Sequence, residues 1–297
     1  MPSERPFLTA SWTELVMLNF AVPGEVIARL APPGTEPDFF AGEAYLSVVG
    51  FMFRDARFFG LGLPWHSRFE EVNLRYYVRR EVGDAVRRGV VFVREIAPRP
   101  LVAATARWLY NENYVTRRMR NRVRLAGSVL AAGDRVEYEW RTGRGSNRRW
   151  NRMAARAAAA PKLPEPDTLT EYIAEHYWAY VHTRDGGAAE YRVAHRPWRV
   201  APAEEVVWDC DLAATYGRTA LAEYLAAPPV LAFVADGSPV QVFPGARIDA
   251  REVHSVSPRL PQRPEVHRRP LQTECVPGDG SHAVTSPLLE LGDRPEE

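Results

Sequence analysis

The stretch "RGVVFVREIAPRP", residues 88–100, begins like a buried strand and then places two opposite charges where the apolar run should continue. The apolar run covers residues 90–93, and Arg94 and Glu95 follow it directly. Side chains of successive strand residues point to opposite faces, so Arg94 and Glu95 cannot pair with each other. One of the two charges therefore faces an interior, and we predict that this interior is a small-molecule pocket in a β-barrel.

The preceding segment "EEVNLRYYVRR", residues 70–80, alternates between polar and apolar positions as a strand does. One face carries Val72, Leu74, Tyr76 and Val78, and the other carries Glu71, Asn73, Arg75, Tyr77 and Arg79. The polar face is either the solvated side of an antiparallel strand or the inner wall of the barrel, with helices covering the apolar face from outside. In the second case Arg75 needs Glu71, Glu95 or an anionic ligand, because an unpaired buried charge costs several kcal/mol.

The rest of the chain also favours strands separated by turns, so we predict a mainly β fold, a β-barrel with a few flanking helices. Residues 1–249 are expected to form one domain, in which residues 143–166 supply few core residues. The Pro- and Arg-rich residues 250–297 are expected to be a disordered tail. The expected elements are hairpins turning at residues 132–134 and 186–187, strands over 44–53 and 230–248, and helical segments over 23–30, 100–109 and 212–226, with another capped by Thr168 or Thr170.

Composition places the chain among ordinary globular proteins. Of its 297 residues 46% are hydrophobic and 25% are charged, and the formal net charge is +1. This balance gives no sign of a globally basic nucleic-acid binder. The first residues lack the basic and apolar regions of a signal peptide, and no window approaches the roughly 18 uninterrupted apolar residues of a membrane span. We therefore expect a cytoplasmic protein without a membrane partner.

Cysteine and histidine usage argues against a metal site. Cys210 and Cys275 form no CxxC motif, and two such cysteines fit a reducing compartment. His176 and His182 lie six residues apart and belong to no HExxH motif. Motifs for nucleotide binding and serine hydrolysis are missing as well. The sequence therefore predicts no metal and no cofactor.

Several segments together resemble the YqjF-like family of uncharacterised bacterial proteins. The resemblance runs from about Trp12 to Ile248. It implies a fold grouped with the acetoacetate decarboxylases, whose β-barrel carries a central pocket. The segments that carry it are "MLNFAV", "LAPPGTEPDFFAGEAYLSVVGFMFRDAR", "GLPWHSRFEEVNLRYYVRR", "GVVFVREIAPRPL", "ARWLYNENY" and "HRPW".

One departure from those decarboxylases bears on the chemistry. Their Schiff-base lysine follows shortly after a strand that ends in an Arg-Glu pair, which this chain matches at Arg94 and Glu95. The chain then continues "IAPRP" through residue 100, without a lysine. A Schiff base needs an amine that can lose its proton, whereas a guanidinium stays protonated. The only lysine, Lys162, is expected in an exposed loop. The chain is therefore not expected to be a Schiff-base decarboxylase.

Our leading hypothesis is a central pocket that binds a small polar or anionic molecule, such as a carboxylate or a keto acid. An alternative is a lysine-independent enzyme, in which Glu95 or Glu71 moves a proton on a carbonyl substrate. The residues expected to bind the ligand are Asn73, Arg75, Tyr77, Arg94 and His182.

A third hypothesis is an interaction protein that uses the arginine-rich segment "RRMRNRVR", residues 117–124, together with the Pro-rich tail. In an extended conformation one face carries Arg118, Arg120, Arg122 and Arg124. This face could contact successive phosphates of a nucleic-acid backbone. A nucleic-acid partner is not favoured, because no RNA-binding signature or aromatic platform accompanies these arginines. The sequence leaves the oligomeric state open.

Overall fold

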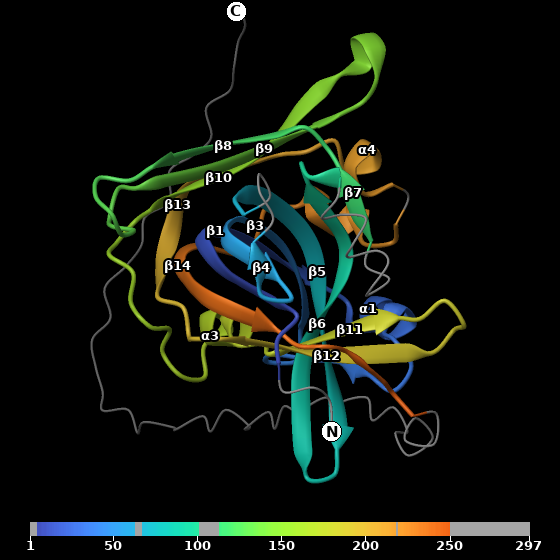
Figure 1. Ribbon diagram of the computed structural model, residues 1–297. Coiled ribbons are helices and arrows are strands. Elements are labelled where there is room, and N and C mark those ends of the chain that lie inside the picture. The colour runs from blue at the N-terminus through green and yellow to red at the C-terminus, as the bar shows by residue number, and fades with distance from the viewer. Residues whose placement is uncertain (1–4, 63–66, 101–112, 218, 250–297) are drawn as a thin grey trace, which may run out of the picture. The chain divides into compact units, whose positions relative to one another are not determined.

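The computed structural model describes residues 5–62, 67–100, 113–217 and 219–249, and strands make up most of them (Figure 1). The predicted mainly β fold with few helices is confirmed. The strands are β1 (Leu8–Val22), β2 (Glu36–Pro37), β3 (Ala44–Phe58), β4 (Leu61–Gly62), β5 (Phe69–Val82), β6 (Ala85–Ala97), β7 (Tyr114–Thr116), β8 (Met119–Arg124), β9 (Arg135–Thr142), β10 (Arg149–Ala157), β11 (Trp178–His182), β12 (Ala188–His195), β13 (Val200–Asp209), β14 (Leu231–Val242) and β15 (Ala246–Arg247).

The described helices are short. They are α1 (Gly24–Leu30), α3 (Leu169–Ala174), α4 (Leu212–Tyr216) and two 3-10 turns, Gly145–Asn147 and Ala222–Ala226. Thr168 caps α3, because its hydroxyl accepts a hydrogen bond from the Glu171 amide at 3.3 Å. No helix within the described ranges has the length and apolar character to cross a membrane. Residues 101–109 of the expected helix and the expected tail lie outside the described residues.

Hydrogen-bonded strands close a ring in the order β12, β11, β6, β5, β3, β1 and β14, with β14 pairing back to β12. Most pairings are long and antiparallel, such as that of β1 with β3 over nearly their whole lengths. Two of the pairings, which we call the seams of the ring, are short. β6 pairs with β11 in parallel through two residue pairs, and β12 pairs with β14 through three. The ring therefore has one continuous wall and one side attached by few backbone hydrogen bonds.

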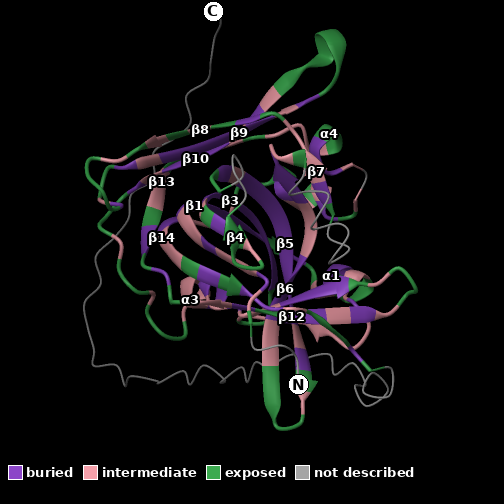
Figure 2. Cartoon of the chain, in the orientation of Figure 1, coloured by how far each residue is buried: buried purple, intermediate pink, exposed green. Residues whose placement is uncertain are grey.

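Two apolar cores lie on the two faces of this wall. The inner core lies inside the ring and includes Met17, Val49, Phe51 and Phe233. The outer core includes Val16, Leu18, Val48 and Leu74 from the same strands, so side chains alternate between the cores as strand geometry requires. Figure 2 shows that β3 and β5 are buried along most of their length, whereas the end of the β5–β6 hairpin is exposed.

A layer of strands covers much of the apolar face of β5, where the sequence suggested helices. β8, β9 and β10 contribute Tyr138, Trp140 and Met153 to the outer core, and α1 adds Val26 and Ile27. β10 also corrects the expectation that residues 143–166 supply few core residues. Its inward positions are mostly alanines, which pack closely but give a weak apolar signal in the sequence.

Gly50 of β3 provides a test of the contact between the two layers. A Cβ atom at Gly50 would lie 2.6 Å from Cδ2 of Tyr138 and 2.9 Å from Sδ of Met153. The Tyr138 ring cannot withdraw easily, because its hydroxyl donates to the Glu14 carbonyl oxygen at 2.8 Å. We expect Gly50→Ala to lower the free energy of unfolding by about 1–3 kcal/mol, the usual cost of overpacking.

Urea denaturation followed by tryptophan fluorescence measures this loss. Gly127→Ala is the matched control, because Gly127 is exposed and a Cβ atom there meets no described atom within 4 Å. Equal stability of the two variants would contradict the proposed packing.

Candidate functional site

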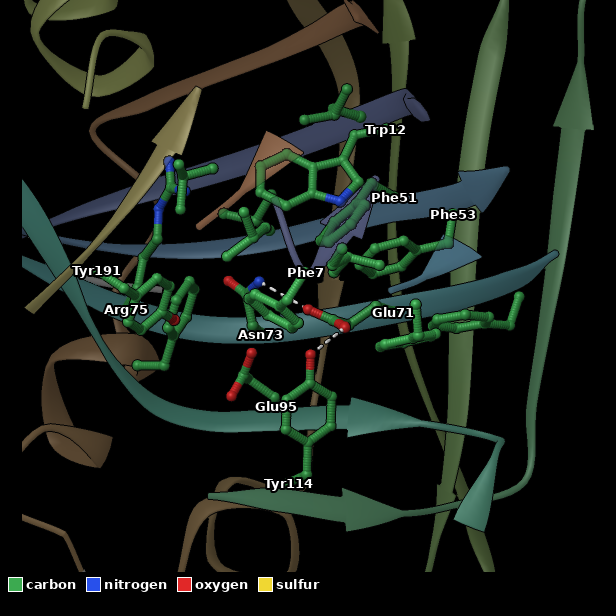
Figure 3. Close-up of a pocket in the computed structure, with 18 of the residues that line it drawn as sticks. Phe7, Trp12, Phe51, Phe53, Glu71, Asn73, Arg75, Glu95, Tyr114 and Tyr191 are labelled. Carbon is green, nitrogen blue, oxygen red and sulfur yellow. Dashed lines mark hydrogen bonds between the residues drawn. The ribbon is translucent and has the colours of Figure 1, made fainter. Parts of the chain in front are cut away.

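A cavity of about 90 Å³ lies inside the ring. This is several times the roughly 10–15 Å³ that a single buried water requires. Most of its wall is apolar and aromatic, and one side carries two carboxylates, an amide, a phenol and a guanidinium (Figure 3). The aromatic residues of the wall are Phe7, Trp12, Phe51, Phe53, Phe58, Phe69, Phe92, Tyr191 and Trp198; the polar ones are Glu71, Asn73, Arg75, Glu95 and Tyr114.

An irregularity in β6 decides which of its two charges faces the cavity. Leu74 of β5 pairs with Arg94, but the next residue, Arg75, pairs with Phe92, so β6 contains one extra residue, Val93. This β-bulge shifts the alternation by one position. Phe92 and Glu95 consequently both line the cavity, although an unbroken strand would turn them to opposite faces.

The two carboxylates meet at Tyr114, which sequence reasoning did not single out. The Tyr114 hydroxyl donates to Glu71 Oε2 at 2.7 Å, and Asn73 Nδ2 donates to Glu71 Oε1 at 3.2 Å (Figure 3). β7 runs parallel to β6 and pairs Tyr114 with Glu95, which brings the second carboxylate beside the same hydroxyl. A lone tyrosine in a three-residue strand gave no signal in the sequence.

Burial dominates the titration of this cluster. Loss of solvation raises the pKa of Glu71 from 4.5 to about 7, and the hydrogen bonds from Tyr114 and Asn73 only partly oppose the rise. The pKa of Tyr114 is raised well above its usual value, first by burial and then by the charges of Glu71 and Glu95. Glu71 therefore exchanges its proton near neutral pH, while Tyr114 stays protonated.

Arg75 is the cation of the cavity wall and is only 7% exposed. One terminal nitrogen donates to the Ile173 carbonyl oxygen at a long 3.4 Å, and the guanidinium carbon lies 5.5 Å from the Tyr77 ring centroid. Its Nε has no hydrogen-bond partner, and no carboxylate among the described residues forms an ion pair with it. Figure 3 shows the guanidinium turned away from Glu71 and Glu95. Of the partners expected for Arg75, Glu71 and Glu95 are therefore wrong, and an anionic ligand stays a prediction.

Three of the remaining expected ligand contacts lie elsewhere. Arg94 points to the opposite face because of the bulge, and its Nη1 donates to the Thr215 carbonyl oxygen at 3.0 Å. His182 ends β11 in an exposed position beside the Leu30 carbonyl oxygen. Tyr77 shares the face of Arg75 but lies outside the cavity wall, where its hydroxyl bonds Ser47. These placements correct the expected roles of Arg94, His182 and Tyr77, while Asn73, Arg75, Glu71 and Glu95 converge on one cavity.

Lys162 is not among the residues that line this cavity. Its side chain is 70% exposed and pairs with Glu165 at 2.8 Å. No amine therefore lines the cavity wall among the described residues. The same part of the chain contains no group of three His, Cys, Asp or Glu side chains suited to hold a metal ion.

The arginine row of β8 faces solvent but meets acidic partners on β9. Arg120 forms a two-point contact with Glu139, and Arg122 lies 3.6 Å from Glu137. Glu137 also accepts a bond from Arg152 at 2.5 Å. Much of the positive charge of this row is therefore balanced within the sheet, as on an ordinary solvated strand face.

The fold is that of the acetoacetate decarboxylase-like enzymes. An acetoacetate decarboxylase-like enzyme from Sphingomonas wittichii RW1 matches with a TM-score of 0.56 over 82% of this chain and 92% of its own, at 12% sequence identity. The acetoacetate decarboxylase from Legionella pneumophila matches with a TM-score of 0.51 over 84% and 92% of the two chains, at 11% identity. Likeness at such low identity concerns the fold alone.

The chain belongs to the DUF2071 family of uncharacterised conserved proteins, whose family model matches residues 9–239. Uncharacterized protein YqjF of Bacillus subtilis (strain 168) is 26% identical over 201 residues, which cover 65% of this chain and 75% of YqjF. The resemblance found in the sequence is thereby confirmed.

The raised pKa of Glu71 predicts a specific pH dependence of stability. Between pH 4.5 and about 7 the folded protein keeps a proton that the unfolded chain releases, so the free energy of unfolding falls as pH rises through this window. Glu71→Gln removes this contribution, which amounts to about 3 kcal/mol at most. We expect the variant to gain stability relative to the wild type between pH 5 and about pH 8.

Chemical denaturation at a series of pH values measures the difference. Glu165→Gln serves as the control, because Glu165 is exposed and its curve should follow that of the wild type. Parallel curves for the wild type and Glu71→Gln would show that Glu71 titrates normally.

Proposed function

We propose that the protein binds a small carboxylic acid inside the ring, with the carboxylate paired to Arg75. The observation that carries this proposal is the buried guanidinium of Arg75 in the cavity wall, which forms no ion pair among the described residues. Burying a charge without a partner is costly, and an anionic ligand supplies the missing partner. A guanidinium also matches a carboxylate in shape, since two parallel N–H donors can face its two oxygens.

The aromatic part of the cavity wall indicates the chemistry of the ligand beyond its carboxylate. The cavity is bordered by aromatic rings that pack on one another, including Trp12 on Phe51 with ring centroids 5.2 Å apart and Phe53 on Phe69 at 4.6 Å. An apolar or flat organic group gains favourable contact there, whereas a second charge would lose its hydration. The cavity thus favours a monocarboxylate with an apolar body.

A fold neighbour supports the choice of a keto acid as one probe. The enduracididine biosynthesis enzyme MppR, solved in complex with pyruvate, matches with a TM-score of 0.53 over 83% of this chain and 92% of its own, at 15% identity. A covalent keto-acid adduct is not proposed for this chain, because Lys162 is exposed and does not line the cavity. Binding here is therefore proposed to be reversible and ionic.

Carboxylate binding is tested by calorimetry with phenylpyruvate, 3-phenylpropionate and pyruvate. We expect the two phenyl acids to bind more tightly than pyruvate, because they bury the additional apolar area. Arg75→Met should weaken the phenyl acids about 30-fold or more, since truncating one partner of a buried charge pair costs at least about 2 kcal/mol.

Two variants separate lost binding from lost folding. Arg75→Lys keeps the charge and should retain part of the affinity, while Arg29→Met removes an exposed arginine of α1 and should change nothing. Binding of these acids that is unaffected by Arg75→Met would refute the proposal.

A second candidate function is proton transfer on a carbonyl substrate, and the cluster of Glu71, Tyr114 and Glu95 favours it. A carboxyl group with a pKa of about 7 can both accept and donate a proton at neutral pH. In the proposed step a carboxylate of the cluster takes the proton from the carbon next to the carbonyl. The C–H electron pair then forms a C=C bond and the C=O π pair moves to the carbonyl oxygen, while the Tyr114 hydroxyl transfers its hydrogen bond from Glu71 to that oxygen.

This chemistry is tested by NMR in D2O, which follows the exchange of the C3 hydrogens of phenylpyruvate for deuterium. We expect exchange above the spontaneous rate, and a decrease of about 100-fold or more in Glu71→Gln and in Glu95→Gln, the usual loss when a general base is removed. Glu165→Gln should retain full activity. If the wild type exchanges these hydrogens only at the spontaneous rate, the proposed proton transfer is refuted and only ligand binding remains.

A further inference from the structure

Several residues of the cavity wall carry buried polar atoms without a hydrogen-bond partner among the described residues. Nε1 of Trp12, Oδ1 of Asn73 and Nε of Arg75 are among these atoms. Buried polar atoms are nearly always satisfied, so each such atom needs an explanation. Because all three residues border one cavity, a molecule inside it can supply the partners.

Trp12 differs from the second tryptophan of the wall. Trp198 donates its indole N–H to the Ser238 hydroxyl at 3.2 Å, and Trp12 packs against the Trp198 ring with centroids 6.3 Å apart. The Trp12 indole N–H makes no such bond. Figure 3 shows its nitrogen on the lower edge of the ring, beside Phe51. The indole N–H of Trp12 is therefore a donor at the cavity wall that lacks a hydrogen-bond acceptor.

Asn73 lacks a hydrogen-bond donor, whereas Trp12 lacks an acceptor. Its amide nitrogen donates to Glu71 Oε1 at 3.2 Å, which fixes the orientation of the side chain and directs Oδ1 elsewhere. Oδ1 is an acceptor only, so its partner must be a donor. A simple carboxylate offers acceptors to Arg75 and Trp12 but has no donor for Asn73.

We infer that the preferred ligand is a hydroxy acid, whose hydroxyl group donates to Oδ1 of Asn73. This inference rests on the proposed binding of a carboxylate at Arg75 and adds a specific requirement to it. A hydroxyl carries one donor and two acceptor lone pairs, so a hydroxy acid can bond all three of Arg75, Asn73 and Trp12, with Trp12 bonding either the hydroxyl or a carboxylate oxygen. Asn73 and Trp12 become residues that determine specificity.

The consequence is discrimination between acids that differ by one oxygen atom. A ligand without the hydroxyl leaves Oδ1 of Asn73 buried and unsatisfied, and this penalty is larger than the net gain from an ordinary hydrogen bond. We therefore expect a preference for the hydroxy acid of about tenfold or more.

The test compares 3-phenyllactate, as each enantiomer, with 3-phenylpropionate by calorimetry on the full chain. The two acids share the carboxylate and the phenyl group and differ only in the hydroxyl. At least one enantiomer of phenyllactate should bind the wild type about tenfold more tightly. In Asn73→Leu the preference should shrink to within twofold. Trp12→Phe should weaken phenyllactate about fivefold, whereas Trp150→Phe, at a residue of β10 outside the cavity wall, should change the affinity less than twofold.

The outcomes separate this inference from the proposed function. Equal binding of the two acids by the wild type, with loss of both in Arg75→Met, would overturn the hydroxyl requirement and leave carboxylate binding intact. A preference that persists in Asn73→Leu would overturn the assignment to Asn73. If neither acid binds, the proposed carboxylate site itself fails. The comparison of the two acids on the wild type needs no variant, so it stands even if a variant does not fold.

Discussion

A single extra residue in β6 determines the chemistry of the cavity. Strand side chains alternate strictly, so without the bulge at Val93 the cavity that receives Phe92 would also receive Arg94, and Glu95 would face the outer core. With the bulge, a carboxylate joins Glu71 and Tyr114, and Arg94 bonds a backbone carbonyl outside. The arrangement of charges inside the ring therefore depends on the backbone register and not on side-chain preference.

The aromatic wall gives these few polar groups their properties. Rings exclude water from Glu71, and the loss of solvation moves its pKa to about 7 despite two hydrogen bonds. The same exclusion leaves Arg75 as a buried cation whose electrostatic attraction for an anion is little screened by solvent. The enclosure thus combines a carboxyl group that titrates near neutral pH with a guanidinium that forms no ion pair among the described residues, and the proposed carboxylate site rests on this combination.

The sequence predicts features that depend on neighbouring residues, such as the faces of a strand, but it does not predict contacts between residues that are far apart in the chain. The alternation of residues 70–80 correctly places Glu71, Asn73 and Arg75 on one face, because the period of a strand is read over a few residues. The bulge has no glycine or proline to mark it, so the choice between Arg94 and Glu95 stays open. Tyr114 and Trp12 reach the cavity through pairings with distant strands, which no local pattern contains. Tyr77 lies on the same face of β5 as Arg75, as predicted, but it lies beyond the end of the cavity, near α3.

The unequal seams of the ring suggest how a molecule enters an enclosure with aromatic walls. β11 and β12 form a hairpin that is held to β6 by two residue pairs and to β14 by three, while the opposite wall is bonded along whole strands. Backbone fluctuations separate the shortest ladders first, since fewer hydrogen bonds must break. This hairpin also carries Tyr191 and Val193 of the cavity wall. We therefore expect the cavity to open to a ligand at this hairpin, where the ion pairs of Glu190 with Arg80 and Arg87 must also give way, while the continuous wall that carries the charged groups stays closed.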